Sequence, residues 1–178
     1  MGTPQEPKPA KYFVGLLTSD DQALPLVYND LVEIFGAIDG KTDLVAWTAS
    51  KFYEAEMGSD LQRGFVSFAR LRSPAELAAL KLSTQAIEEK FRSRESGGRR
   101  VNLDPGYVDM YKAVLASTKN AGQRVYLDRG IYAEATLLYY DGGFHGLPYT
   151  YADYLWPETL TFLTRLRAHY LEQLRQVW

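Results

Sequence analysis

Cysteine is absent from the 178-residue sequence, and histidine occurs only twice, as His145 and His169. Without thiols the chain has no disulfides, thiolate catalysis, zinc-thiolate sites or cysteine-ligated iron–sulfur clusters. Neither histidine has a partner at metal-ligand spacing, so the histidines do not indicate a metal site. The lack of cysteine fits a reducing compartment, and we expect a cytoplasmic protein.

Long hydrophobic runs are also missing from the sequence. No apolar run approaches the roughly 20 residues with which a helix spans a bilayer. The first ten residues are polar and contain three prolines, unlike the apolar stretch of an export signal. We expect no membrane contact, a flexible N-terminal arm over residues 1–10, and a single domain over residues 11–178.

A strong charge of either sign is the third absence. The formal net charge is −2, and the chain is 46% hydrophobic and 24% charged, which is typical of globular domains. This charge disfavours nucleic acid as a partner, so weak single-stranded nucleic-acid binding stays a second alternative to the functions below.

The glycine-rich motifs that bind phosphate do not occur. The P-loop pattern G-x-x-x-x-G-K-[S/T] and the dinucleotide pattern G-x-G-x-x-G are both missing, as is the G-x-S-x-G elbow of hydrolases. The glycines of segment 142–146 follow a predicted strand with no helix behind them, which favours a flexible turn. Established nucleotide and hydrolase signatures therefore do not apply.

Apolar periodicity predicts an α+β fold with a mainly antiparallel or mixed sheet and about three helices packed on it. Two predicted hairpins near the C-terminal end favour antiparallel pairing, with the helices on one face. Ser73, Pro74 and Glu76 form a capping box that opens a helix. The final helix packs on the sheet or, alternatively, forms a homodimer. We expect strands over 12–17, 43–52, 64–71, 124–127 and 131–140, a strand end in 101–107, and helices over 73–92, 157–177 and from within two residues of Pro25 to about Gly36. Segment 108–117 is open between a strand and a short helix.

The segment Asp104-Pro105-Gly106 has the chemistry of a tight turn, because proline fixes φ and glycine accepts positive φ. One interpretation is a structural turn only. The other places the Asp104 carboxylate, as a catalytic group, and the Tyr107 hydroxyl, as a ligand contact, at the mouth of a cleft.

Three cations follow this segment and are candidate ligand-binding residues. Lys112, Lys119 and Arg124 lie within about twenty residues, and hydroxyl side chains precede Lys119. Such groups near a strand end bind phosphate or carboxylate. The alternative is that they are solvated surface side chains.

Glu134 is a second candidate catalytic carboxylate, because it interrupts an otherwise apolar strand. Hairpin pairing would bring Arg124 onto the same face, either as an ion pair on a wet sheet face or as part of an inward-facing ligand site. We predict that Asp104, Lys119, Arg124 and Glu134 lie close together.

Glu54 and Glu56 would share one face of an extended chain and could then bind Mg²⁺, the one cofactor that the sequence suggests. Surface acids on a loop are the alternative. Tyr107, Tyr132 and Tyr151 are candidates for stacking on a ligand ring. Tyr151 belongs to a tyrosine-rich loop that could instead cover a sheet edge.

Six fragments of the chain carry a family resemblance in their order and spacing: residues 11–17, 53–58, 63–68, 101–107, 115–119 and 149–154. Together they resemble the bacterial domain-of-unknown-function family numbered 4416. The resemblance implies a compact cytoplasmic bacterial protein and carries over no catalytic residue.

The sequence leaves the function open between classes. The first hypothesis is a domain that binds a small anionic ligand, phosphate- or nucleotide-like, with Mg²⁺-dependent chemistry as an extension. The alternative is a non-enzymatic protein–protein interaction module that docks through the tyrosine-rich loop or the basic final helix. Whether the protein is an enzyme is not decided by these patterns.

Overall fold

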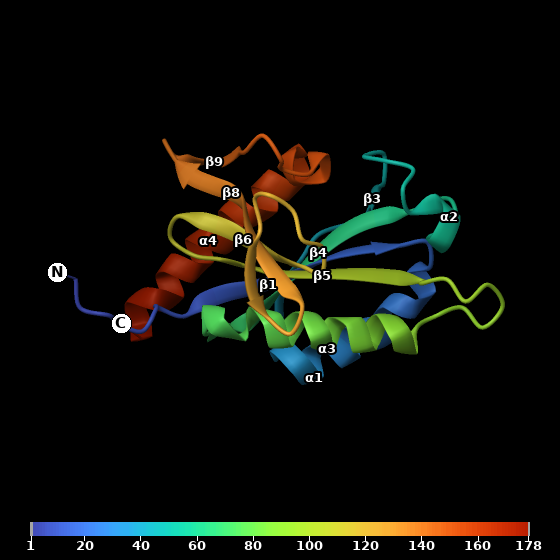
Figure 1. Ribbon diagram of the computed structural model, residues 1–178, viewed down its shortest axis with the longest axis horizontal. Helices are drawn as coiled ribbons and strands as arrows, with labels where there is room; N and C mark the ends of the chain where they lie inside the picture. The colour runs from blue at the N-terminus through green and yellow to red at the C-terminus, as the bar shows by residue number, and fades with distance from the viewer. Residues whose placement is uncertain (1, 178) are drawn as a thin grey trace.

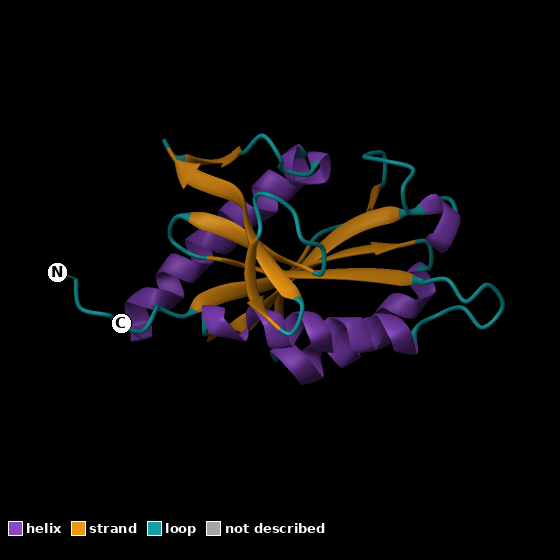
Figure 2. Cartoon of the chain, viewed as in Figure 1, coloured by secondary structure: helices purple, strands orange, loops and turns teal. Residues whose placement is uncertain are grey.

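The computed structural model describes residues 2–177, which form a sheet with helices on both faces (Figures 1 and 2). The strands are β1 (Ala10–Thr18), β2 (Ile38–Lys41), β3 (Val45–Ala46), β4 (Gln62–Arg72), β5 (Val101–Val108), β6 (Lys112–Ser117), β7 (Val125–Asp128), β8 (Ile131–Tyr140) and β9 (Gly143–Gly146). The helices are α1 (Leu24–Phe35), α2 (Glu54–Met57), α3 (Leu77–Lys90) and α4 (Pro157–Val177), with 3₁₀ turns η1 (Asp21–Ala23), η2 (Pro74–Glu76) and η3 (Ala152–Leu155).

Within residues 2–177 the sheet has nine strands, and every pairing is antiparallel. The order is β2-β4-β1-β5-β6-β8-β7, with β3 added beside β4 and β9 beside β8. The predicted α+β class with a mainly antiparallel sheet is confirmed. No helix in this part of the chain combines the length and hydrophobicity of a membrane span.

Strand β1 lies inside the sheet between β4 and β5, and all nine of its residues are buried. Its nearly continuous apolar run follows from this position, because both faces are covered and a strand alternates its side chains between them. Tyr12, Val14 and Leu16 point to one face, where α1 and α3 cover them. Phe13 points to the other face, where it packs with Phe162 of α4.

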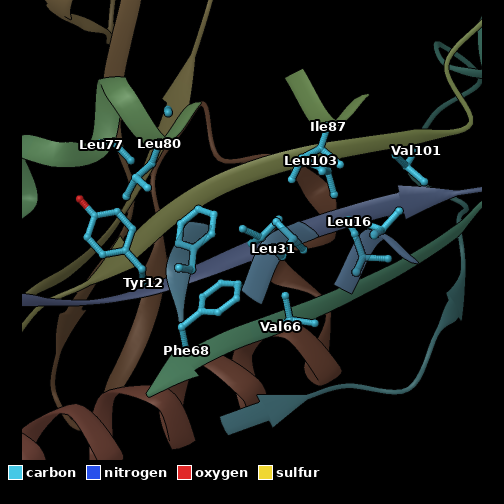
Figure 3. Close-up of a cluster of buried hydrophobic side chains, with 14 of the residues drawn as sticks. Tyr12, Leu16, Leu31, Val66, Phe68, Leu77, Leu80, Ile87, Val101 and Leu103 are labelled. Carbon is cyan, nitrogen blue, oxygen red and sulfur yellow. The ribbon is translucent and has the colours of Figure 1, made fainter. Parts of the chain in front are cut away.

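The core under α1 and α3 combines side chains of both helices with those of β1, β4 and β5, and residues of β6 and β8 extend it (Figure 3). Phe68 of β4 stacks on Phe35 of α1, with ring centroids 4.5 Å apart. Tyr12 is fully buried but satisfies its hydroxyl by donating to the Ser73 carbonyl, 2.9 Å away. This layer therefore contains apolar surface with its few polar atoms paired.

Helix α4 covers the opposite face of the sheet, so the expectation that all helices share one face is wrong. Figure 1 shows α1 and α3 together along one side and α4 apart from them. The reason lies in β1 and β4, which carry Phe13 and Phe65 on that second face. Large apolar side chains on both faces of a strand require a cover on both.

The local signals for helix ends are confirmed. Ser73 and Glu76 form the predicted capping box, and Pro74 opens the turn that leads into α3. Helix α1 ends at Gly36, whose φ of 92° favours glycine. Segment 43–52 is different: β3 occupies only two of its residues and the rest is loop, so the predicted strand there is largely wrong.

Asp104, Pro105 and Gly106 lie inside β5 and not in the predicted turn. Strand β6 pairs with β5 only from Gly106 to Val108, so the first part of β5 has an unpaired edge. Leu103 directs its N–H and carbonyl toward that edge, and residues two apart in a strand point the same way. The missing N–H of Pro105 therefore falls where no strand needs a donor.

Candidate functional site

The sheet opens into a cleft where β6 separates from β5. The free edge of β5 is closed by α3: the Leu103 N–H donates to Glu88 Oε1 at 2.6 Å, and Lys81 Nζ donates to the Leu103 carbonyl at 2.8 Å. Buried backbone groups must find partners. Two charged side chains here provide the hydrogen-bond partners that a neighbouring strand would otherwise supply. Because no strand lies along this edge, there is space beside this part of β5.

The cleft has a volume of 480 Å³, within the range of small-molecule sites. Two other surface hollows, around His169 and around Phe91, are larger and more open to solvent. The cleft lining includes cationic side chains (Arg63, Lys81, Arg99, Lys119, Arg124), acidic side chains (Glu88, Asp104, Glu134, Asp153) and aromatic side chains (Trp47, Phe52, Tyr53, Tyr151, Tyr154).

Arg63 is the centre of the charged floor. Its side chain is 4% exposed, and its Nη2 lies 2.9 Å from Asp153 and 3.2 Å from the Tyr154 hydroxyl, while Nη1 lies 3.6 Å from Asp104. Gly15 of β1 makes room for it, because a Cβ there would lie 2.8 Å from Nη2. Within residues 2–177 the buried Nε has no hydrogen-bond partner. One arginine thus holds two acids from distant segments in place.

The pKa values of the two acids beside Arg63 shift in opposite directions. Burial raises the pKa of Asp104, but the charges of Lys81 and Arg63 outweigh it, and the net pKa is below the usual value. Burial also raises the pKa of Asp153, and Arg63 offsets this only in part, so the net pKa is above the usual value. Asp104 is therefore the firmly ionised member of the pair.

Arg124 and Glu134 form a buried ion pair at the other side of the cleft. Arg124 Nε lies 2.7 Å from Glu134, with side-chain exposures of 5% and 1%. The remaining guanidinium nitrogens donate to the Lys119 carbonyl at 2.9 Å and to the Tyr151 hydroxyl at 2.6 Å. Each of the three guanidinium nitrogens of Arg124 thus donates a hydrogen bond within the protein, and two of these bonds position the Lys119 backbone and the Tyr151 hydroxyl.

Asp104, Lys119, Arg124 and Glu134 border the same cavity, so the predicted proximity of these four residues is confirmed. Tyr151 lines it as well. Their roles in binding or catalysis stay predictions.

Three other candidates lie outside the cleft. Tyr107 lies three positions from Asp104 on β5 and faces the opposite side, where it packs on Tyr12 with ring centroids 5.7 Å apart. Burial raises the pKa of Tyr107 to about 12. Tyr132 packs edge-on against an exposed tyrosine of β7, and Lys112 pairs with Asp109 at 2.5 Å. The structure does not bring these side chains to the site.

Glu54 and Glu56 lie in the helical turn α2, so the extended chain assumed for the Mg²⁺ site is wrong. Residues two apart on a helix do not face each other. Glu56 is held by Arg99 through bonds of 2.7 and 2.8 Å, and neither glutamate lines the cleft. In the described part of the chain, no group of three or more His, Cys, Asp or Glu is placed to hold a metal ion.

Sequence reasoning missed Arg63, Lys81, Glu88 and Asp153. For two of them a signal exists: Lys81 and Glu88 share the buried stripe of α3 with Leu77. Charged residues at core positions of a helix are rarely buried unless they are paired. The apolar neighbours of Arg63 in β4 give a weaker signal of the same kind.

Comparison with known proteins gives a family and nothing more specific. No curated protein and no solved structure matches the chain. Residues 8–170 match the family described as Domain of unknown function (DUF4416), which covers nearly the whole chain. The chain belongs to this family of domains of unknown function.

Proposed function

We propose that the protein binds a small anionic molecule, phosphate- or nucleotide-like, in the cleft. The observation that carries this proposal is the charge of the lining, where five cationic side chains face four acidic ones, an excess of one positive charge. Within residues 2–177, Lys119 is the lining cation that forms no ion pair. An anion entering the cleft finds an unpaired ammonium group there.

Two buried acids increase this positive character. Burial raises the pKa of Glu88, with Lys81 opposing in part, and burial raises the pKa of Asp153. Each acid is therefore easier to protonate than a free carboxyl group, and its protonation leaves more of the surrounding positive charge to an anionic ligand.

The contacts of the two predicted catalytic acids, Glu134 and Asp104, favour a role in ligand binding over a role in proton transfer. Glu134 accepts bonds from Arg124 and from the Thr136 hydroxyl, and it is almost fully buried. Asp104 has bonds to both oxygens, from Lys81 to one and from Asn102 to the other. Asp104 keeps 28% of its side chain exposed and is thus the acid placed to meet a ligand or its bound Mg²⁺.

A thermal-shift titration tests the proposal, using inorganic phosphate, ribose 5-phosphate and nucleoside monophosphates, each with and without Mg²⁺. A ligand at a hundredfold excess over its Kd stabilises the native state by about 2.7 kcal/mol. We expect Lys119→Met to abolish the shift. Lys112→Met is the matched control, since Lys112 lies outside the cleft in a local pair with Asp109. Equal loss in both variants, or no shift with any anion, contradicts the proposal.

Interaction through the tyrosine-rich loop is the second candidate, and the contacts favour it less. Tyr154 is buried, Tyr149 donates to the Ala135 carbonyl, and Tyr151 accepts from Arg124. The hydroxyl groups of Tyr149 and Tyr151 are thus used inside the molecule. We therefore place ligand binding first.

A further inference from the structure

Two exposed side chains that line the cleft contact each other. Lys119 Nζ lies 4.7 Å from the centroid of the Phe52 ring. Phe52 belongs to the loop before α2 and is 68% exposed, whereas Lys119 belongs to the loop between β6 and β7. Both side chains line the cleft. A cation over an aromatic face in water is a weak attraction that a better partner can replace.

Phe52 is the first ring in a chain of packed aromatic side chains. It packs edge-on against Tyr53 at 5.1 Å, Tyr53 against Trp47 at 5.9 Å, and Trp47 against Trp156 at 5.9 Å. The Trp47 indole N–H is satisfied within its own loop by a bond of 2.7 Å to a backbone carbonyl. The aromatic wall of the cleft is thus fixed while the Phe52 ring stays accessible.

The backbone of Lys119 is fixed in a similar way, while its ammonium group stays accessible. Its carbonyl accepts from Arg124, and its N–H donates to the Ser117 hydroxyl at 3.1 Å. Arg124 is in turn locked by the buried Glu134. The long lysine side chain can therefore leave the Phe52 ring without moving the loop that carries it.

We propose that the ligand carries a planar ring next to its anionic group, and that its binding replaces the contact between Lys119 and Phe52. The ring stacks on Phe52 and the anionic group pairs with Lys119. This inference rests on the proposed function. Nucleotides and aromatic carboxylic acids share this chemistry, and the experiment below separates them.

Selectivity follows from the existing contact. An anion without a ring draws the ammonium group away from Phe52 and leaves that ring exposed with nothing in return. A ring without an anion displaces the ammonium group from its aromatic partner and offers it no charge. Only a molecule with both parts replaces each lost interaction by a stronger one, because an ion pair and a stacked ring then form together.

Isothermal titration calorimetry tests this with five probes on the full chain. Adenosine 5′-monophosphate and indole-3-acetate carry both a ring and an anion, ribose 5-phosphate and inorganic phosphate carry only the anion, and adenosine carries only the ring. We expect at least one of the two double probes to bind about tenfold more tightly than ribose 5-phosphate, inorganic phosphate and adenosine, as stacking on an aromatic side chain provides. Whichever double probe binds identifies phosphate or carboxylate as the anion.

Two variants assign that gain to its residues. We expect Phe52→Leu to bind the double probe no better than ribose 5-phosphate, and Lys119→Met to bind it no better than adenosine. Tyr126→Leu is the matched control, because Tyr126 is also an exposed aromatic packed edge-on against a neighbouring tyrosine, and it lies outside the cleft. This control should bind like the wild type.

The failure of this inference differs from the failure of the proposed function. If ribose 5-phosphate binds as tightly as both double probes and Phe52→Leu leaves the affinities unchanged, the proposed ring of the ligand is contradicted. Anion binding in the cleft then still stands. If none of the five probes produces heat, anion binding is contradicted and the inference falls with it.

Discussion

Leu103 and Asp104 are neighbours on β5, yet they belong to two regions of opposite character. Leu103 points into the apolar core under α1 and α3, while Asp104 lines the charged cleft. In the core, stability comes from apolar area removed from water and no single partner is essential. In the cleft, every buried charge depends on a particular partner, so the loss of one group leaves others uncompensated. The core is thus the robust region of the molecule, and the cleft is the region sensitive to the loss of single groups.

Phe68→Ala tests the core and should have the largest effect on the free energy of unfolding. Phe68 is fully buried and stacks on Phe35. We expect a loss of about 4 kcal/mol in the free energy of unfolding, from lost burial and the cavity that remains. Urea unfolding followed by circular dichroism measures it. A loss below about 1 kcal/mol, the usual size for a surface change, would show that this packing is not central.

Arg63→Met tests the charged groups of the cleft. Asp104 and Asp153 lose their shared partner, and we expect a loss of about 3 kcal/mol at neutral pH. The pKa of Asp104 in the folded state is below the ordinary value of 3.8, so the loss should shrink only as the pH falls through that lowered pKa. Below it both acids are protonated in the folded and the unfolded states, since the folded-state pKa of Asp153 is raised. Unfolding at neutral and acid pH measures the difference. A loss that is independent of pH would contradict this account of Arg63.

Glu88→Gln tests how the stability of the cleft depends on pH. Burial raises the pKa of Glu88, so its contribution to stability is full below the ordinary value of 4.5 and is lost as the pH rises through the folded-state value. Glutamine keeps an oxygen for the Leu103 N–H and does not titrate. We expect the variant to gain in stability relative to the wild type as the pH rises above 4.5. A constant difference across this range would show that Glu88 is not strained by burial.

Lys119→Met should have the smallest effect on stability. Its side chain is exposed and its contact with Phe52 is weak, so we expect a change within about 0.5 kcal/mol, as for other surface positions. Urea unfolding checks this alongside the binding experiments. A large loss would mean that Lys119 is structural and that its binding phenotype is indirect.

The same contrast explains how much could be predicted from the sequence. The core was predictable because its signals are local: the capping box at Ser73, and the apolar run of β1. The cleft was predictable only in part. Arg124 and Glu134 were paired correctly because a short hairpin brings them together.

The rest of the cleft depends on long-range contacts that local patterns do not contain. Arg63 meets Asp104 and Asp153 only after β4, β5 and η3 assemble, and no local pattern indicates that meeting. Pro105 suggested a turn because its local chemistry fits one, while the decisive fact was the unpaired edge of β5. Phe52 was missed because its segment was predicted to be a strand.

The measurement that tests the central claim most directly is a titration of ¹⁵N-labelled protein with adenosine 5′-monophosphate, followed by the amide shifts. If the cleft is the ligand site, the shifts should be largest around Phe52 and from Ser117 to Lys119, two of the segments that line it. Shifts that instead gather around His169, in the hollow beside α4, would contradict the account and move the site to that hollow.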